Sequence, residues 1–179
     1  MKVFKIVFLT LCLAAMVPSA QAQKFGVKAG VNIAQVSGND FGDVKPLTGF
    51  HAGVFKEVTL VPELLFLQPE LQYSMQGFKV EDTDYSIGYI NIPIVAKVYL
   101  LKLISLEAGP QLGFKINDNF EGNSGDDLET FDAAIVGGIG LNFPLGLSIN
   151  ARFAQGLTEI VKDSDAKNQV IQLGAAFKF

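Results

Sequence analysis

Six charged side chains stand at isolated positions inside apolar segments that alternate with a period of two. They are Lys28, Glu70, Lys97, Glu107, Arg152 and Lys178. If these segments are strands, each charge lies on the face opposite the apolar side chains. Such a set could form a proton or ion relay, or a structural network of paired charges. We expect the structural network, because charges placed in a closed interior are tolerated only when they are paired.

Other candidates for catalysis or ligand binding are weak. His51 is the only histidine, expected near the outer end of its strand, and no motif supplies the nucleophile and orienting group that a catalytic histidine needs. The loop NDNFEGNSGDDLET offers oxygen ligands but lacks the spacing of a calcium loop, so solvated acids, or acids bridged by divalent cations to lipopolysaccharide, are expected there. The GGIG at 137–140 lies within a strand and is no dinucleotide site. We expect no enzyme activity, no catalytic or metal-binding residues and no cofactor.

The six charges lie in segments that we predict to be β-strands. The terminal stretch NQVIQLGAAFKF alternates apolar and polar or small residues and ends on Phe177 and Phe179. The same pattern recurs over about 24–34, 48–58, 64–76, 89–100, 104–115, 131–143 and 147–153. About ten residues is the length that a tilted strand needs to cross a bilayer. We therefore predict an all-β fold: an eight-stranded antiparallel up-and-down transmembrane barrel.

The direction of the apolar face separates this prediction from a soluble lipid-binding barrel with its apolar face inward. A soluble barrel would expose its other face to water and carry many charges there. Here that face carries mostly small residues, by our register Gly26, Gly30, Gly53, Gly109, Gly113, Gly138, Gly140, Gly146 and Gly174. We expect Leu65, Ile92, Leu106, Ile149 and Leu173 to face lipid, and the lumen to be filled by Phe55, Phe66, Tyr89, Tyr99 and Arg152.

A tight turn at Leu101-Lys102 predicts the register of its two strands. Positions whose numbers sum to about 204 then pair, which places Lys97 opposite Glu107. We predict a salt bridge between them, extended across the lumen by Glu70 and Arg152. Pro69, Pro93 and Pro110 fall within strands and remove ladder donors, so they indicate either bulges or slips of this register.

The connections are expected to alternate between long and short, with both termini on one side. In outer-membrane barrels the short turns are periplasmic and the long loops extracellular. Four predicted long loops hold most of the acids: Asp40, Asp43, Glu81, Asp82, Asp84, Asp118, Glu121, Asp126, Asp127, Glu129, Glu159, Asp163 and Asp165. The sequence thus predicts an acidic extracellular rim.

Residues 1–22 have the features of a secretory signal peptide. Lys2 and Lys5 precede an apolar run that contains Cys12, and a small-residue cleavage site follows at 20–22. We expect the mature barrel domain to span 23–179, without cysteine. Loss of the two lysines changes the net charge from −4 to −6. The mature chain has no basic stripe, so nucleic acid is an unexpected partner.

Several short motifs, spread over the whole mature segment, resemble the PorT-like outer-membrane β-barrel family of Bacteroidota. They are FGVKAGVN, QPELQYSMQG, YINIPIVAKVYL, GGIGLNF, NARFAQGL and the terminal FKF. The resemblance implies an eight-stranded barrel inserted by the barrel-assembly machinery, which reads a terminal aromatic such as Phe179. Some relatives serve a secretion apparatus, and the family brings no catalytic residues.

Together these observations predict an integral outer-membrane protein in contact with lipid. Its expected role is structural or interaction-based, presenting acidic loops to a surface or secretion-system partner. A narrow small-solute porin and an accessory barrel of a secretion system are the alternatives.

Overall fold

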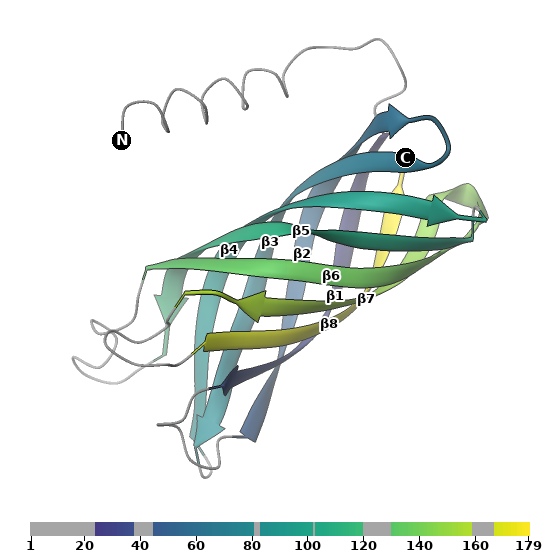
Figure 1. Ribbon diagram of the computed structural model, residues 1–179. Coiled ribbons are helices and arrows are strands. Elements are labelled where there is room, and N and C mark those ends of the chain that lie inside the picture. Colours follow the sequence, from purple (N-terminus) through teal and green to yellow (C-terminus); the bar gives the residue numbers. More distant parts are fainter. Residues whose placement is uncertain (1–23, 38–44, 81–82, 102, 120–129, 159–166) are drawn as a thin grey trace, which may run out of the picture.

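Eight antiparallel strands form a closed barrel in the computed structural model of the protein (Figure 1). The structure describes residues 24–37, 45–80, 83–101, 103–119, 130–158 and 167–179. The strands are β1 (Lys24–Ser37), β2 (Lys45–Val61), β3 (Leu65–Val80), β4 (Thr83–Leu100), β5 (Ile104–Asp118), β6 (Phe131–Asn142), β7 (Leu147–Gly156) and β8 (Lys167–Lys178). A 3-10 turn, η2 (Pro144–Gly146), joins β6 to β7. No described helix is long and apolar enough to cross a membrane.

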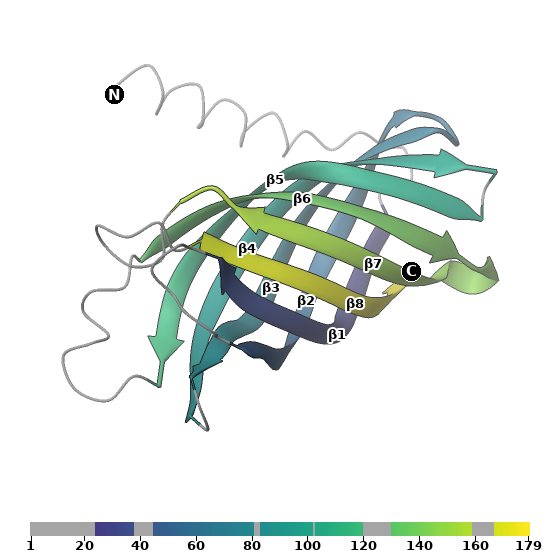
Figure 2. The ribbon, with the colours of Figure 1, turned by 60° about the horizontal axis from the view of Figure 1, so that its bottom comes forward.

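The ring closes where the last strand pairs with the first. β8 lies antiparallel to β1, with Gly26 opposite Lys178 and Gly30 opposite Gly174. Figure 2 shows these two strands side by side. The amide of Phe179 donates the final hydrogen bond of this seam to the carbonyl of Phe25, at 2.9 Å. Neither β1 nor β8 is therefore left as an open sheet edge.

The apolar face points outward, as predicted. Leu106 is 47% exposed and Ile149 is 52% exposed, and Ile92 and Leu173 are exposed as well. The alternate positions on the same strands carry buried polar groups, such as Gln111 and Gln172. The prediction of outward leucines and isoleucines is confirmed, and the soluble barrel with an apolar lumen is wrong.

Polar residues delimit the outward apolar band on β1. At one end, the Lys56 ammonium lies 5.4 Å from the centre of the Phe25 ring. At the other end, Gln35, Gln169 and Gln155 form a hydrogen-bonded ladder across β1, β8 and β7, with 2.9 Å for each bond. With a rise of about 3.3 Å per residue and a tilt of about 40°, the segment between Phe25 and Ile33 spans about 20 Å, most of the apolar band of about 25 Å in outer-membrane barrels.

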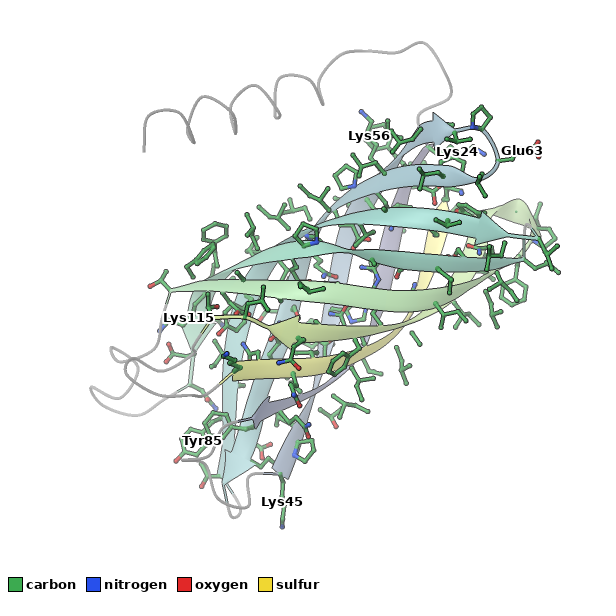
Figure 3. All side chains as sticks on the ribbon, viewed as in Figure 1. Lys24, Lys45, Lys56, Glu63, Tyr85 and Lys115 are labelled. Atoms are coloured by element: carbon green, nitrogen blue, oxygen red, sulfur yellow. The ribbon has the colours of Figure 1, made fainter. Side chains whose placement is uncertain are left out.

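Charged and polar residues outside this band mark the two ends of the barrel. Lys24, Lys56 and Glu63 lie at the end that carries the short turns and the C-terminus, whereas Lys45, Tyr85 and Lys115 lie at the opposite end (Figure 3). We call the first end the turn end and the second the loop end.

One predicted long loop, Gly77–Asp84, is wrong. β3 runs to Val80 and β4 starts at Thr83, and these two residues pair with each other. The Lys79 ammonium forms an exposed ion pair with the Asp84 carboxylate at 2.8 Å. Lys79, Thr83 and Asp84 give this hairpin tip the polar composition of a loop. Asp84 and Asp118 therefore lie on strands, and the connections do not alternate strictly between long and short.

The three prolines neither shift the register nor create bulges. Pro69 pairs with Ile94 in the same register that holds Gln72 opposite Asn91. Pro110 likewise pairs with Ile135 without a shift. The register shifts lie elsewhere, at 46–51 and 59–61 of β2 and at 88–89 of β4. Each proline thus costs a ladder donor and inserts no residue.

Candidate functional site: a charge network in the lumen

Four buried charges from alternate strands meet in the lumen. Lys28 of β1, Glu70 of β3, Glu107 of β5 and Arg152 of β7 form this central ion cluster, in which every side chain is at most 3% exposed. Arg152 binds Glu70 through both terminal nitrogens, at 2.8 Å and 2.6 Å. Its Nη2 also donates to Glu107 Oε2 at 3.0 Å, and its Nε donates to Oε1 of the same carboxylate. The guanidinium therefore holds two carboxylates in bidentate fashion.

Lys28 completes the cluster. Its ammonium lies 2.9 Å from Glu70 Oε2. Two cations and two carboxylates then balance in formal charge, which is the condition for burying ions at a tolerable cost. The sequence predicted all four residues as inward charges, and the structure brings them together.

A glycine on β6 makes room for the cluster. A Cβ atom at Gly138 would lie 2.8 Å from Arg152 Cγ and 3.1 Å from Glu107 Oε1. Gly140, the next inward position, would similarly crowd Ser105. The small residues of the lumen therefore lie opposite its largest ones. Of the nine glycines predicted to face inward, Gly146 does not: it lies in the turn η2 with a φ of 85°.

Lys97 pairs with a residue that the sequence analysis missed. The predicted register is confirmed, since Lys97 lies opposite Glu107. The predicted ion pair between them is wrong: the Lys97 ammonium lies 3.4 Å from Glu57 Oε1 of β2, while Arg152 engages Glu107. A long lysine side chain reaches across the lumen as readily as to its neighbour on the next strand.

Glu57, Lys97 and Lys178, together with Tyr99, form a second group, the mouth ion cluster. Glu57 accepts hydrogen bonds from Lys178 Nζ and from the Tyr99 hydroxyl, each at 2.6 Å. Both ammonium groups also lie over the Tyr99 ring, at 5.1 Å and 5.3 Å from its centre. Glu57 lies on the same face of β2 as His51 and Phe55, and this alternation could have identified it as an inward residue. It was missed because it lies next to the predicted end of the strand.

Gln68 joins the two clusters. Its amide nitrogen donates to Glu70 Oε1 at 2.6 Å, and its carbonyl oxygen accepts from Lys97 Nζ at 3.5 Å. One polar network thus extends from the mouth of the barrel at the turn end to its centre.

Beyond the central ion cluster, toward the loop end, the lumen is lined by amides instead of charges. The buried side chains of this amide layer have polar atoms without a protein partner: Gln72, Asn91, Gln111 and Gln172. Buried polar groups normally find a partner, and ordered water supplies it where protein does not. The amides of this layer are therefore free to hydrogen-bond water.

The sequence suggested that His51 lies near the outer end of its strand. In the structure it lies within β2 and borders the amide layer. It is 1% exposed. Its Nδ1 lies 2.8 Å from the Asn32 side-chain oxygen, while Nε2 has no protein partner. Asn32 in turn donates to the Ser74 hydroxyl at 2.9 Å. Neither neighbour is a charged orienting group, so the arrangement offers no activated nucleophile.

Several apolar side chains and Asp132 line the described part of the lumen near the loop end. Ile87, Tyr89, Leu47 and Phe78 are buried there. Asp132 accepts hydrogen bonds from the Thr158 hydroxyl at 2.8 Å and from the Asn168 amide at 3.4 Å. Within the described part of the chain, no group of three or more His, Cys, Asp or Glu side chains could hold a metal ion.

A cavity of about 330 Å³ opens at the turn end. Lys24, Lys97, Lys178 and Glu57 contribute its charges, and Phe55, Tyr99, Phe143 and Phe179 its aromatic walls. Most of these side chains belong to the lumen face of their strands. The cavity is therefore the open mouth of the barrel.

This geometry defines a class: a transmembrane β-barrel with lipid on its apolar outer face and a polar lumen. Residues 20–162 match the family model described as the outer membrane protein beta-barrel domain, and the chain belongs to that family. It is thus an eight-stranded β-barrel protein of the bacterial outer membrane.

Solved structures show the same fold. Neisserial surface protein A aligns with a TM-score of 0.60 and 14% identity over 87% of this chain and 97% of its own. The attachment invasion locus protein Ail of Yersinia pestis aligns with a TM-score of 0.56 and 14% identity over 89% of this chain and all of its own. No curated protein matches the sequence. At such identities these structures support the fold and carry no residue roles.

Proposed function

We propose that the mature protein, residues 23–179, is a closed and non-conducting barrel that anchors an acidic loop surface outside the cell. The observation that carries this proposal is the central ion cluster. Arg152 and Lys28 bind two carboxylates from facing strands, so four strands are tied across the middle of the lumen. Eight strands enclose an interior that side chains can fill. We infer that the cluster blocks passage and stiffens the barrel, and that the protein catalyses no reaction.

The acidic loops give the anchor its interaction surface. Most of the acids expected at this rim lie in segments outside the described residues, so the argument for them rests on the sequence. Ail has been solved in complex with the heparin analogue sucrose octasulfate, a polyanion. A rim rich in Asp and Glu would repel such a ligand. We propose cationic groups, divalent cations or a basic surface protein as its partners.

The remaining sequence-based expectations belong to the same proposal. Removal of residues 1–22 as a signal peptide would deliver the chain to the periplasm, and the barrel-assembly machinery would recognise the terminal Phe177 and Phe179. Both rings are exposed, and their centres lie 6.3 Å apart, which supports their availability to such a receptor. We also propose that the protein is related to the PorT-like barrels of Bacteroidota and that it acts beside a secretion apparatus.

A narrow pore is the second candidate, and the amide layer is the observation that favours it. Water held by Gln72, Asn91 and Gln111 would fill part of the path. The central ion cluster would then act as its barrier.

Planar-bilayer recording on the purified protein distinguishes the two functions. We expect no conductance steps from the native barrel. Combined replacement of Arg152, Glu70 and Glu107 by alanine should produce steps, whereas the matched removal of the exposed Lys79–Asp84 pair should not. Conductance of the native protein would refute the closed barrel.

The orientation is tested separately with single cysteines, since the segment 23–179 has none. A cysteine in place of Asp126 should react with a membrane-impermeant maleimide in intact cells. A cysteine in place of Leu101 should react only after the outer membrane is permeabilised. The opposite pattern would place the acidic loops in the periplasm.

A further inference from the structure

The three short turns present apolar side chains to the surroundings of the barrel. Leu101 in the β4–β5 turn is 89% exposed and Leu145 in the β6–β7 turn is 92% exposed. Leu60 and Leu64 flank the β2–β3 turn and are also exposed. Turn tips of a barrel normally carry small or polar residues, so the turn end has an unusually apolar rim.

The backbone makes this choice of residues more informative. Leu101 and Leu145 adopt left-handed φ values of 53° and 67°. Glycine, asparagine and aspartate occupy such positions at least cost, and a branched apolar side chain is disfavoured. Leucine is therefore unfavourable at both positions, because of the left-handed backbone conformation and because of the exposure to water. A partner that covers them would offset both disadvantages.

The mouth cavity lies inside this rim and is electropositive. Among the side chains of its lining, three lysines, Lys24, Lys97 and Lys178, stand against the carboxylate of Glu57. Both Lys97 and Lys178 already share Glu57, so the lining retains an excess of positive charge. The chemistry that complements this site is a carboxylate on an otherwise apolar group.

The shape of the cavity favours a polypeptide over a lipid as the occupant. The cavity is lined by lumen-facing side chains such as Phe55 and Tyr99 and by the exposed Phe143, Leu147 and Phe179, so it opens at the turn end of the barrel. A volume of about 330 Å³ is small for a ligand site. It accommodates a side chain or a chain terminus and is too small for an acylated headgroup.

We propose that the turn end is a docking surface for a periplasmic protein segment in which an acidic side chain or C-terminal carboxylate is flanked by apolar residues. The carboxylate enters the mouth cavity beside Lys97 and Lys178, and the flanking residues cover Leu101 and Leu145. This inference relies on the orientation proposed above, because the short turns of outer-membrane barrels face the periplasm.

Site-specific photocrosslinking in living cells tests the surface. The full-length chain would carry a benzophenone amino acid in place of Leu103, which is 60% exposed beside Leu101. A second version would carry it in place of Leu106, on the lipid-facing wall, as the control. We expect a discrete protein adduct from position 103 alone, and mass spectrometry should place the crosslink next to an Asp, a Glu or a C-terminus among apolar residues.

Two variants then test the mechanism without weakening the barrel. Leu101→Asn and Leu145→Asn relieve the left-handed conformation, so the variant with both changes should retain the heat-resistant migration of the folded barrel. We expect its adduct yield to fall about tenfold, the effect of losing an apolar anchor. Lys24→Gln, which changes an exposed lysine of the cavity lining, should lower the yield as well.

Every outcome bears on the proposal. Lipid adducts alone, no adduct, a crosslink to a basic or wholly polar segment, or a yield that the variants leave unchanged would each overturn it. Reaction of a cysteine at position 101 in intact cells would instead refute the orientation, and this result separates failure of the proposed function from failure of the docking surface.

Discussion

The two halves of the lumen solve the problem of buried polarity in different ways. Toward the turn end, the charges are concentrated and paired, with Arg152 alone making four hydrogen bonds to two carboxylates. Toward the loop end, neutral amides such as Gln72 and Asn91 lack protein partners at both side-chain atoms. An unpaired ion costs far more to bury than an amide that water can reach. The paired half should therefore govern stability, and the amide half hydration.

The largest expected effect comes from removing the cation that holds the paired half together. Arg152→Ala leaves Glu70 and Glu107 with Lys28 as the only remaining cation of the central ion cluster. We expect a loss of about 3–5 kcal/mol, the cost of breaking a buried ion pair. Urea unfolding in detergent, followed by the shift of the folded band on electrophoresis, measures it. A loss below about 1 kcal/mol would mean that water already reaches the cluster.

A charge on the other face of the same strand should cost nearly as much for a different reason. Leu106 precedes Glu107 and is exposed on the lipid side. Leu106→Arg should destabilise the barrel by about 2–4 kcal/mol if the side chain lies near the bilayer midplane. The measurement is equilibrium unfolding in lipid vesicles. The same substitution should be nearly neutral in water, so an effect near zero would contradict the lipid-facing assignment.

The smallest effect is expected in the amide half. Gln72→Leu removes two polar atoms that have no protein partner and keeps a similar shape. Replacing an unsatisfied group by an apolar one is close to neutral, so we expect a change within about 1 kcal/mol. Unfolding under the conditions used for Arg152→Ala gives the comparison directly. A loss comparable to that of Arg152→Ala would show that the two halves are equally important.

Alternation along the sequence predicted the faces of the strands because a lipid-facing wall must be apolar without interruption. Ile92 and Ile149 each belong to a strand in which every second residue is apolar. The tight turn at 101 then predicted that Lys97 lies opposite Glu107. This information is local, and the structure confirms it.

The predictions failed where the structure is not determined by the alternation of neighbouring residues. The hairpin tip at Gly77–Asp84 projects beyond the apolar band, so its residues lose the apolar alternation that identifies a strand. The partner of Lys97 depends on which of several facing strands its flexible side chain reaches, and sequence spacing does not encode that distance. The effect of the prolines could not be predicted either. A proline within a strand is compatible both with an unchanged register that lacks one backbone hydrogen bond and with a β-bulge, and the sequence does not distinguish the two.

The seam between β1 and β8 ties the first strand of the barrel to the last residue of the chain, through the bond from Phe179 to Phe25. No partial barrel can therefore form stably while the C-terminal strand is missing, since both neighbours of that strand would present bare backbone groups to lipid. Stable insertion of the closed barrel therefore requires β8, and a chain in which β8 has not yet paired exposes strand edges that favour aggregation.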